Sequence, residues 1–275
     1  MASEHTLPTV ASLWAGDALT WLHELCLASY VHFGHEVVLF YVGPSAPSVP
    51  AGVVTRPSLD IWDHEADGHG DAPAAMLSDL FRLHLMKQTD MVWIDTDMLC
   101  LQPMPESDYY AGYEQAGAIN SAVLRLPQDS ETLELLLGWF ADPEWVPHWL
   151  AGHLRRRIES EPEGKRLLKS FELIRPVLGP RALTHTMKRT GEAAHAQKAS
   201  VFYPVRGVMS DVLFSGYVPK DHWKQDDTLA VHLYSSLLRR YHKLHRPEQN
   251  SFIARFAQEI GFDFGELKHQ SQGTD

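Results

Sequence analysis

Hydrophobic positions in the N-terminal part of the chain follow two patterns, one typical of buried strands and one typical of helices. Continuous apolar runs occupy residues 37–42 and 91–94, as in strands covered on both faces of a mainly parallel sheet. Another strand is predicted at residues 7–14, and the apolar side chains after it recur at helical spacing until Gly34, a typical C-terminal stop. This order predicts a strand–helix–strand unit that opens a doubly wound sheet, with Asp17 as the helix N-cap.

The rest of the chain continues the alternation of strands and helices. We predict strands at residues 53–56, 109–114, 118–126 and 229–234, and helices at residues 73–85, 129–140, 180–190 and 247–260. The predicted fold class is α/β, with a Rossmann-like, mainly parallel sheet flanked by helices. No G-x-G-x-x-G motif follows the first strand, so a mononucleotide fits this fold better than a dinucleotide such as NAD.

Size, charge and cysteine content narrow the class of protein. The 275 residues suffice for one sizeable domain, and a formal charge of −11 argues against a general nucleic-acid binder. No apolar run approaches the roughly 20 residues needed to span a bilayer, and the N-terminus lacks the pattern of an export signal, so we expect a cytoplasmic protein. Cys26 and Cys100 are too few for a disulfide framework.

Two acidic residues, Asp95 and Asp97, follow the buried strand at residues 91–94 directly. In open α/β sheets, ligands bind beyond the carboxyl ends of the strands. Residues i and i+2 of an extended segment point the same way, so both carboxylates could bind one divalent cation, for which Mg²⁺ or Mn²⁺ is the best match. Such a cation usually completes its shell with water and phosphate, which implies a phosphorylated ligand. A D-x-D triplet also arises by chance, so its context decides between the two interpretations.

Three further residues are candidates for contacts to that ligand. Asp79 and Arg82 are three apart on the helix before the acidic pair, where they form either a surface ion pair or a site for a ribose or sugar hydroxyl. Trp14 lies near the carboxyl end of the first strand, where its indole either stacks on a nucleotide base or packs in the core.

Several motifs occur in the order found in a known family. These are SLWAG, FGHEVVLFYV, SDLFR, IDTDMLCLQP, AINSAVLRLP, LGPRALT, FYPV and AVHLY. With them the chain resembles the bacterial DXD-motif sugar transferases of capsule or lipooligosaccharide synthesis. Those are relatives of the α-1,4-galactosyltransferases, of the yeast initiating mannosyltransferases and of the glucosyltransferase domains of large bacterial toxins. The likeness covers most of the chain.

This resemblance implies a single GT-A-type domain over residues 1–275, with a nucleotide-sugar-binding half at 1–128 and an α-rich acceptor-side half at 129–275. It implies transfer of a hexose, with retention of configuration, from a nucleoside diphosphate sugar to a glycan or glycolipid hydroxyl, with a UDP-hexose as the leading donor. Asn120 then lies beside the donor sugar, and His232 completes a Mn²⁺ or Mg²⁺ site with Asp95 and Asp97. Without the resemblance, Asn120 pairs or caps a strand end and His232 is an ordinary core histidine.

The chain also departs from the family pattern at two places. These are Thr89-Asp90, before the strand that precedes Asp95, and residues 234–236, after His232. The sequence does not securely place an internal nucleophile for a retaining reaction, and Glu114 and Asn120 are candidates only.

Two other functions stay open. One is a phosphohydrolase with an aspartate nucleophile and Asp226-Asp227 as a second acidic pair, and the other is a binding module without turnover.

Two basic clusters and one group of tryptophans each have a structural and a functional interpretation. The basic clusters at residues 153–157 and 239–246 are either solvated faces or contacts to anionic lipid or a phosphorylated acceptor. The tryptophans at 139, 145 and 149 are either packing residues or a stacking surface for sugar rings.

Overall fold

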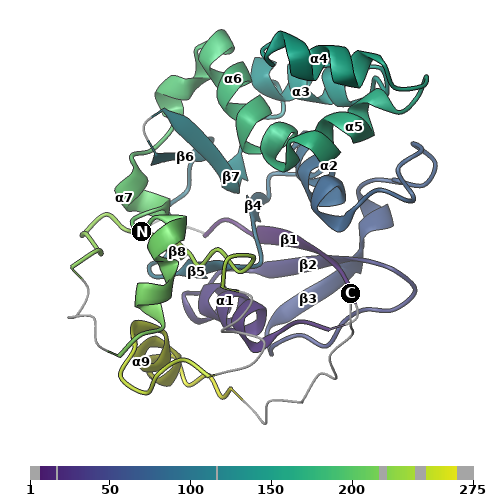
Figure 1. Ribbon diagram of the computed structural model, residues 1–275. Helices are drawn as coiled ribbons and strands as arrows, with labels where there is room; N and C mark the ends of the chain where they lie inside the picture. The colour runs from purple at the N-terminus through teal and green to yellow at the C-terminus, as the bar shows by residue number, and fades with distance from the viewer. Residues whose placement is uncertain (1–6, 17, 116, 217–221, 239–245, 265–275) are drawn as a thin grey trace, which may run out of the picture.

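The computed structural model describes residues 7–16, 18–115, 117–216, 222–238 and 246–264. They form a six-stranded sheet of order β3-β2-β1-β4-β7-β6 and a two-stranded sheet of β5 and β8 (Figure 1). The strands are β1 (Val10–Ala15), β2 (Val37–Val42), β3 (Val53–Pro57), β4 (Val92–Ile94), β5 (Met98–Cys100), β6 (Tyr110–Gln115), β7 (Ala118–Arg125) and β8 (Ala230–His232). The helices are α1 (Trp21–His32), α2 (Ala74–Gln88), α3 (Glu131–Phe140), α4 (Gly152–Glu159), α5 (Arg166–Leu173), α6 (Pro180–Thr190), α7 (Ala199–Phe202) and α9 (Phe252–Glu259), with short 3₁₀ helices η1 (Ser58–Asp60), η2 (Arg175–Val177), η3 (Glu192–His195) and η4 (Gly207–Leu213).

The large sheet is mainly parallel, which confirms the predicted α/β class. Strands β3, β2, β1 and β4 run parallel to one another, whereas β7 is antiparallel to both β4 and β6. The two antiparallel pairs were not predicted, because a single apolar run does not reveal the direction of its neighbour.

Both faces of the central strands are covered, which explains their continuous apolar runs. Ala11 and Trp93 belong to the core under α2, α3, α5 and α6, whereas Val10, Val92 and Ile94 belong to the core on the α1 side. Successive strand residues point to opposite faces, so a strand buried on both sides needs apolar residues at every position. The sheet therefore lies between two helical layers (Figure 1).

The first helix begins later than predicted, at Trp21 instead of beside Asp17. Thr20 is its N-cap, and the Thr20 backbone N–H donates to Nδ1 of His23 over 3.3 Å. Asp17, the predicted cap, lies outside the described residues. The predicted stop is confirmed, since Gly34 has φ of 89°, a left-handed conformation that glycine adopts without strain.

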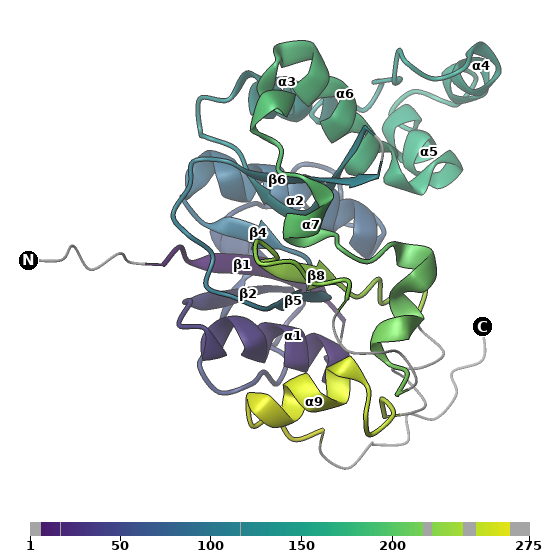
Figure 2. The ribbon, with the colours of Figure 1, turned by 90° about the vertical axis from the view of Figure 1, so that its left-hand side faces the viewer.

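A third core joins α1, α9 and the two-stranded sheet. Leu22 of α1, Ile253 of α9 and Leu99 of β5 are all buried in it, and α1 and α9 lie side by side beneath the sheets in Figure 2. The C-terminal helix begins at Phe252, with Ser251 as its N-cap, and not at residue 247 as predicted. None of the helices in the described part of the chain is long and apolar enough to cross a membrane.

The chain reverses its direction of travel across the sheet between β1 and β4. It passes outward from β1 through β2 to β3 and then returns, by way of α2, to add β4 on the other side of β1. Only two residue pairs, Val10 with Val92 and Ala11 with Trp93, join β1 to β4 before the strands separate. In doubly wound sheets, such a switch point leaves the crevice in which ligands bind.

Candidate active site

A cavity of about 470 Å³ lies where β1 and β4 separate. Its wall includes Ser12 and Leu13 of β1 and Trp93 of β4. Six of the residues selected from the sequence also line it, from segments far apart in the chain: Asp79, Arg82, Asp95, Asp97, Asn120 and His232. The tertiary structure thus brings the predicted donor and metal residues into one cavity, with the exception of Trp14.

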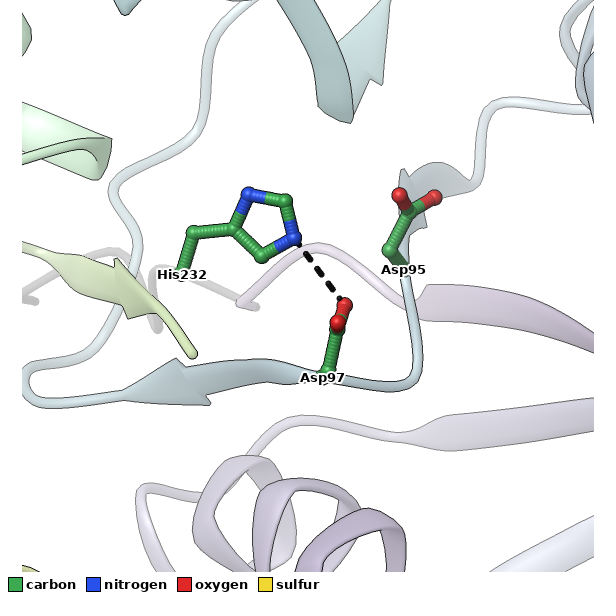
Figure 3. Close-up of side chains that lie close together, drawn as sticks. All are labelled: Asp95, Asp97 and His232. Carbon is green, nitrogen blue, oxygen red and sulfur yellow. Dashed lines mark hydrogen bonds and ion pairs between the residues drawn. The ribbon is translucent and has the colours of Figure 1, made fainter. Parts of the chain in front are cut away.

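Asp95 and Asp97 face the same cavity for a reason other than the one predicted. They lie in a tight turn between β4 and β5, closed by a 3.0 Å hydrogen bond from the Met98 N–H to the Asp95 carbonyl oxygen. The prediction of an extended segment was therefore wrong, although its consequence holds. The turn bends the chain from β4 into β5 and leaves both carboxylates beside one space, near His232 (Figure 3).

His232 reaches this turn from the opposite strand of the small sheet. In the antiparallel ladder of β5 and β8, His232 pairs with Met98, the residue after Asp97. Its Nε2 lies 3.1 Å from Oδ1 of Asp97 (Figure 3). Ligand atoms of Asp95, Asp97 and His232 all lie within 4.8 Å of one another, and this is the one such cluster among the described residues.

The three side chains fit a divalent metal ion. Neighbouring ligands about 2.1 Å from an octahedral ion lie about 3.0 Å apart, close to the 3.1 Å between Asp97 and His232. Two carboxylates suit Mg²⁺ and Mn²⁺, and a transition ion such as Mn²⁺ accepts an imidazole more readily than Mg²⁺ does. The Ser235 N–H donates to Oδ2 of Asp97 over 2.8 Å, which orients the carboxylate with Oδ1 toward the cluster.

Burial and the neighbouring charges shift the pKa values of Asp97 and His232 in opposite directions. Burial by itself raises the pKa of Asp97, but the adjacent His232 and the Ser235 N–H outweigh it and hold that pKa well below its usual range. Burial likewise lowers the pKa of His232, and the charges of Asp97, Asp95 and Glu114 outweigh it and raise that pKa. Asp97 is therefore ionised over the whole physiological range, as a metal ligand must be.

Arg82 connects the acidic turn to helix α2. Its guanidinium donates to the Ser121 carbonyl oxygen over 2.8 Å, and it lies 3.1 Å from Asp79 Oδ1 and 3.5 Å from Asp95 Oδ1. The Trp93 indole N–H also donates to Asp95 Oδ1, over 2.7 Å. Two donors thus hold one oxygen of Asp95 and direct its carboxylate into the cavity.

Asp79 forms a buried ion pair with Arg82, and not the surface pair that spacing alone suggested as one alternative. Burial raises the pKa of Asp79 to about 7, against the lowering effect of Arg82. The carboxylate lies against Gly179, just before α6, where an added Cβ would be 2.6 Å from Oδ1. Glycine is needed there because of this close approach. The motif LGPRALT includes this glycine, but nothing in the sequence indicated that Asp79 contacts it.

Asn120 belongs to a hydrogen-bond chain that sequence reasoning did not foresee. Its Oδ1 accepts from the Ala122 N–H over 2.8 Å, and its Nδ2 donates to Glu114 over 2.8 Å. The other oxygen of Glu114 accepts from the hydroxyl of Tyr234 over 2.9 Å. The Tyr234 ring in turn stacks on His232, with centroids 3.9 Å apart.

Tyr234 has a strained backbone. Its φ of 52° is the one left-handed value at a non-glycine residue in the described chain. Such a conformation costs about 1–3 kcal/mol and persists where the surroundings require it, often at functional sites. Here it directs the ring onto His232 and the next N–H, that of Ser235, onto Asp97. The sequence gave no indication of this strain, because a tyrosine does not ordinarily mark a left-handed position.

Trp14 is not among the described residues that line the cavity. It lies near the end of β1, half-buried, and its ring packs on His23 with centroids 4.7 Å apart. The stacking of a nucleotide base on Trp14 stays a prediction. The tryptophans at 139, 145 and 149 pack on one another, with centroids 5.5 Å apart in each pair, beside the core under α3.

The second acidic pair, Asp226-Asp227, does not join the cavity. Asp227 forms an ion pair with Lys198 over 2.7 Å and accepts from the Ser200 hydroxyl, while Asp226 is exposed. The basic cluster at residues 153–157 forms part of α4, with Arg156 and Arg157 exposed. In the other basic cluster, residues 239–245 lie outside the described residues.

No protein-family model and no curated protein matches the chain. Among solved structures, the chain is similar to one described as the PaToxG glycosyltransferase, with 12% sequence identity and a TM-score of 0.44. The similarity covers 68% of this chain and 71% of that one. A likeness this distant does not identify an activity, which has to be inferred from the site.

Proposed function

We propose that this protein is a metal-dependent glycosyltransferase that moves a hexose from a nucleoside diphosphate sugar to a hydroxyl of a glycan or glycolipid. The observation that carries the proposal is the convergence of Asp95, Asp97 and His232 in a cavity at the switch point of a doubly wound sheet. A bound Mn²⁺ or Mg²⁺ would supply positive charge for the departing diphosphate.

Other residues of the cavity have roles that follow from their contacts. Arg82 fixes Asp79 and Asp95, and so sets the position of the carboxylates before any ligand binds. Asp79 offers a buried carboxyl group that could hold a ribose or sugar hydroxyl. Asn120, whose amide is fixed by Glu114, offers a polar group beside the space for the transferred sugar. Pre-orientation of this kind lowers the cost of binding and of reaching the transition state.

The phosphohydrolase alternative loses support from the same geometry. That reaction was assigned a second acidic pair at Asp226-Asp227, and Asp227 is neutralised by Lys198 outside the cavity. No lysine lines the cavity among the described residues. A binding module without turnover has the same geometry as an enzyme, so a turnover measurement separates the two.

The test is release of nucleoside diphosphate from UDP-glucose, UDP-galactose and GDP-mannose by chelator-treated protein, with and without added Mn²⁺. We expect turnover of at least one donor that depends on the ion. Asp97→Asn should lower it about a hundred-fold or more, because the loss of one preorganised charge has effects of that size. Asp226→Asn, at an exposed carboxylate, is the matched control. Equal turnover by the Asp97→Asn variant and the wild type would contradict the proposal.

A further inference from the structure

A second cavity, of about 630 Å³, adjoins the first. It is lined by residues of β6, α6 and the segment from α7 to η4, and none of its charged residues belongs to the wall of the first cavity. None of the donor and metal residues named in the proposed transfer lines it.

Glu114 forms the boundary between the two cavities. Glu114 lines the second cavity, yet its carboxylate oxygens accept hydrogen bonds from two residues that line the first. The donors are Nδ2 of Asn120 and the hydroxyl of Tyr234. Tyr203 contributes to the same boundary, since it lines the second cavity while its ring meets His232 edge to face, with centroids 6.1 Å apart. A molecule in the second cavity therefore lies one side chain away from the candidate metal ligands.

The charge of the second cavity is opposite to that of the protein. Lys188 of α6, Lys198 before α7 and Arg206 before η4 converge on it from three segments, against one acid, Glu114, in a chain of formal charge −11. Lys188 donates to the Gly117 carbonyl oxygen over 2.6 Å, and Lys198 is paired with Asp227. No ion pair of Arg206 is found in the described part of the chain, so this guanidinium is available to an anion.

Exposed apolar side chains lie directly beside Arg206. Val208 and Met209 are 85% and 53% exposed, and Leu237, which is 60% exposed, packs against the intervening Gly207. Five large hydrophobic side chains are exposed among the described residues, and these are three of them. A group of exposed apolar side chains in one place usually marks a site of contact with another molecule.

We infer that the second cavity binds the acceptor and that this acceptor carries a phosphate group, held by Arg206 and Lys188. The identification of this ligand as the acceptor rests on the proposed transferase function. The phosphate site itself rests only on the charges and the cavity. The phosphate could belong to a soluble sugar phosphate or to a lipid headgroup, whose chain would then contact Val208 and Met209.

The experiment measures phosphate binding directly, without turnover. Protein in chelator is titrated with glucose 1-phosphate by calorimetry, and is sedimented with phosphatidylcholine vesicles with and without phosphatidic acid. The chelator removes the divalent ion that would draw a phosphate into the first cavity. Arg206→Glu and Lys188→Gln are the test variants, and the glutamine retains a donor for the Gly117 carbonyl. Lys165→Glu, at an exposed lysine that lines neither cavity, is the control.

We expect the wild type to bind one of the two probes and each test variant to bind it about ten-fold more weakly, the loss of one charge-assisted hydrogen bond. Binding of the sugar phosphate alone assigns a soluble acceptor, and binding of the anionic vesicles alone assigns a lipid one. Failure of both probes, or an equal loss with Lys165→Glu, would overturn the inference. Donor turnover by the wild type is a separate readout, and its absence would count against the proposed function while leaving a measured phosphate site intact.

Discussion

The imidazole of His232 and the carboxylate of Asp97 meet across 135 positions of sequence, because Met98 and His232 lie opposite each other in the ladder of β5 and β8. The small sheet therefore assembles the candidate metal site. Strand pairing holds the two side chains in register, and the hydrogen bond from Ser235 to Asp97 fixes the carboxylate from the same segment.

Replacing His232 should weaken the metal site without unfolding the protein. In His232→Ala, two carboxylates remain and the third ligand is lost, so we expect the Kd for Mn²⁺ to rise about ten-fold or more. Calorimetry with Mn²⁺ measures this directly. His195→Ala, at an exposed histidine of η3, is the matched control. An unchanged Kd in His232→Ala would remove His232 from the set of ligands.

Gly179→Ala should disturb Asp79. The new methyl group would lie 2.6 Å from Oδ1, a separation that real Cβ atoms do not tolerate, so either Asp79 or the start of α6 must shift. We expect lower thermal stability and a higher KM for the donor. Gly138→Ala is the control, since the exposed Gly138 of α3 has open space around it. That change should stabilise the protein by about 0.5–1 kcal/mol, because alanine favours a helix over glycine. Similar effects of the two substitutions would contradict the contact.

Asp79 should make stability depend on pH in the metal-free protein. Its pKa in the folded state, about 7, lies above the usual value of 3.8, so folding favours the protonated form. This contribution is complete below pH 3.8 and is lost as the pH rises through about 7. Asp79→Asn lacks it, so the free energy of unfolding of the variant relative to wild type should increase as the pH rises across this window. Urea unfolding in chelator at several pH values tests the slope, and a constant difference would exclude the effect.

Tyr234→Phe should affect transfer more than metal binding. The phenyl ring can still stack on His232, but the hydrogen bond to Glu114 is lost, and Glu114 is then held by Asn120 alone. We expect the Kd for Mn²⁺ to stay the same and kcat for donor turnover to fall about ten-fold, the effect of one hydrogen bond. A changed Kd with unchanged kcat would assign the hydroxyl to the metal site instead.

Arg82→Lys should show that a positive charge alone is insufficient. Arg82 contacts Asp79, Asp95 and the Ser121 carbonyl at once, and it lies 4.8 Å from the centroid of the Trp93 ring. A lysine ammonium is a point charge and cannot reproduce this planar set of contacts. We expect about 1–3 kcal/mol lower stability from groups left unpaired in the interior. Arg181→Lys, at an exposed site on α6, is the control in chemical unfolding, and equal stability of both variants would contradict this role.

The sequence alone predicted the class of fold, every described strand except β5, and six of the residues that line the candidate site. Local interactions make this possible, because the runs at residues 37–42 and 91–94 could be apolar throughout only if both faces were covered. The carboxylates were found for a similar reason, since Asp95 follows a buried strand and therefore emerges at its end.

The tertiary structure decided how those residues meet. The pairing of β5 with β8, the contact of Gly179 with Asp79 and the hydrogen bond from Ser235 to Asp97 join segments 100 to 138 positions apart. The turn at Asp95 and the strain at Tyr234 are local, but they depend on the packing around them. Trp14 had as good a sequence argument as Asn120, yet Asn120 lines the cavity and Trp14 packs on His23. Side-chain periodicity specifies which face of an element is buried, whereas contacts between distant segments depend on how whole elements dock, a property that no local pattern encodes.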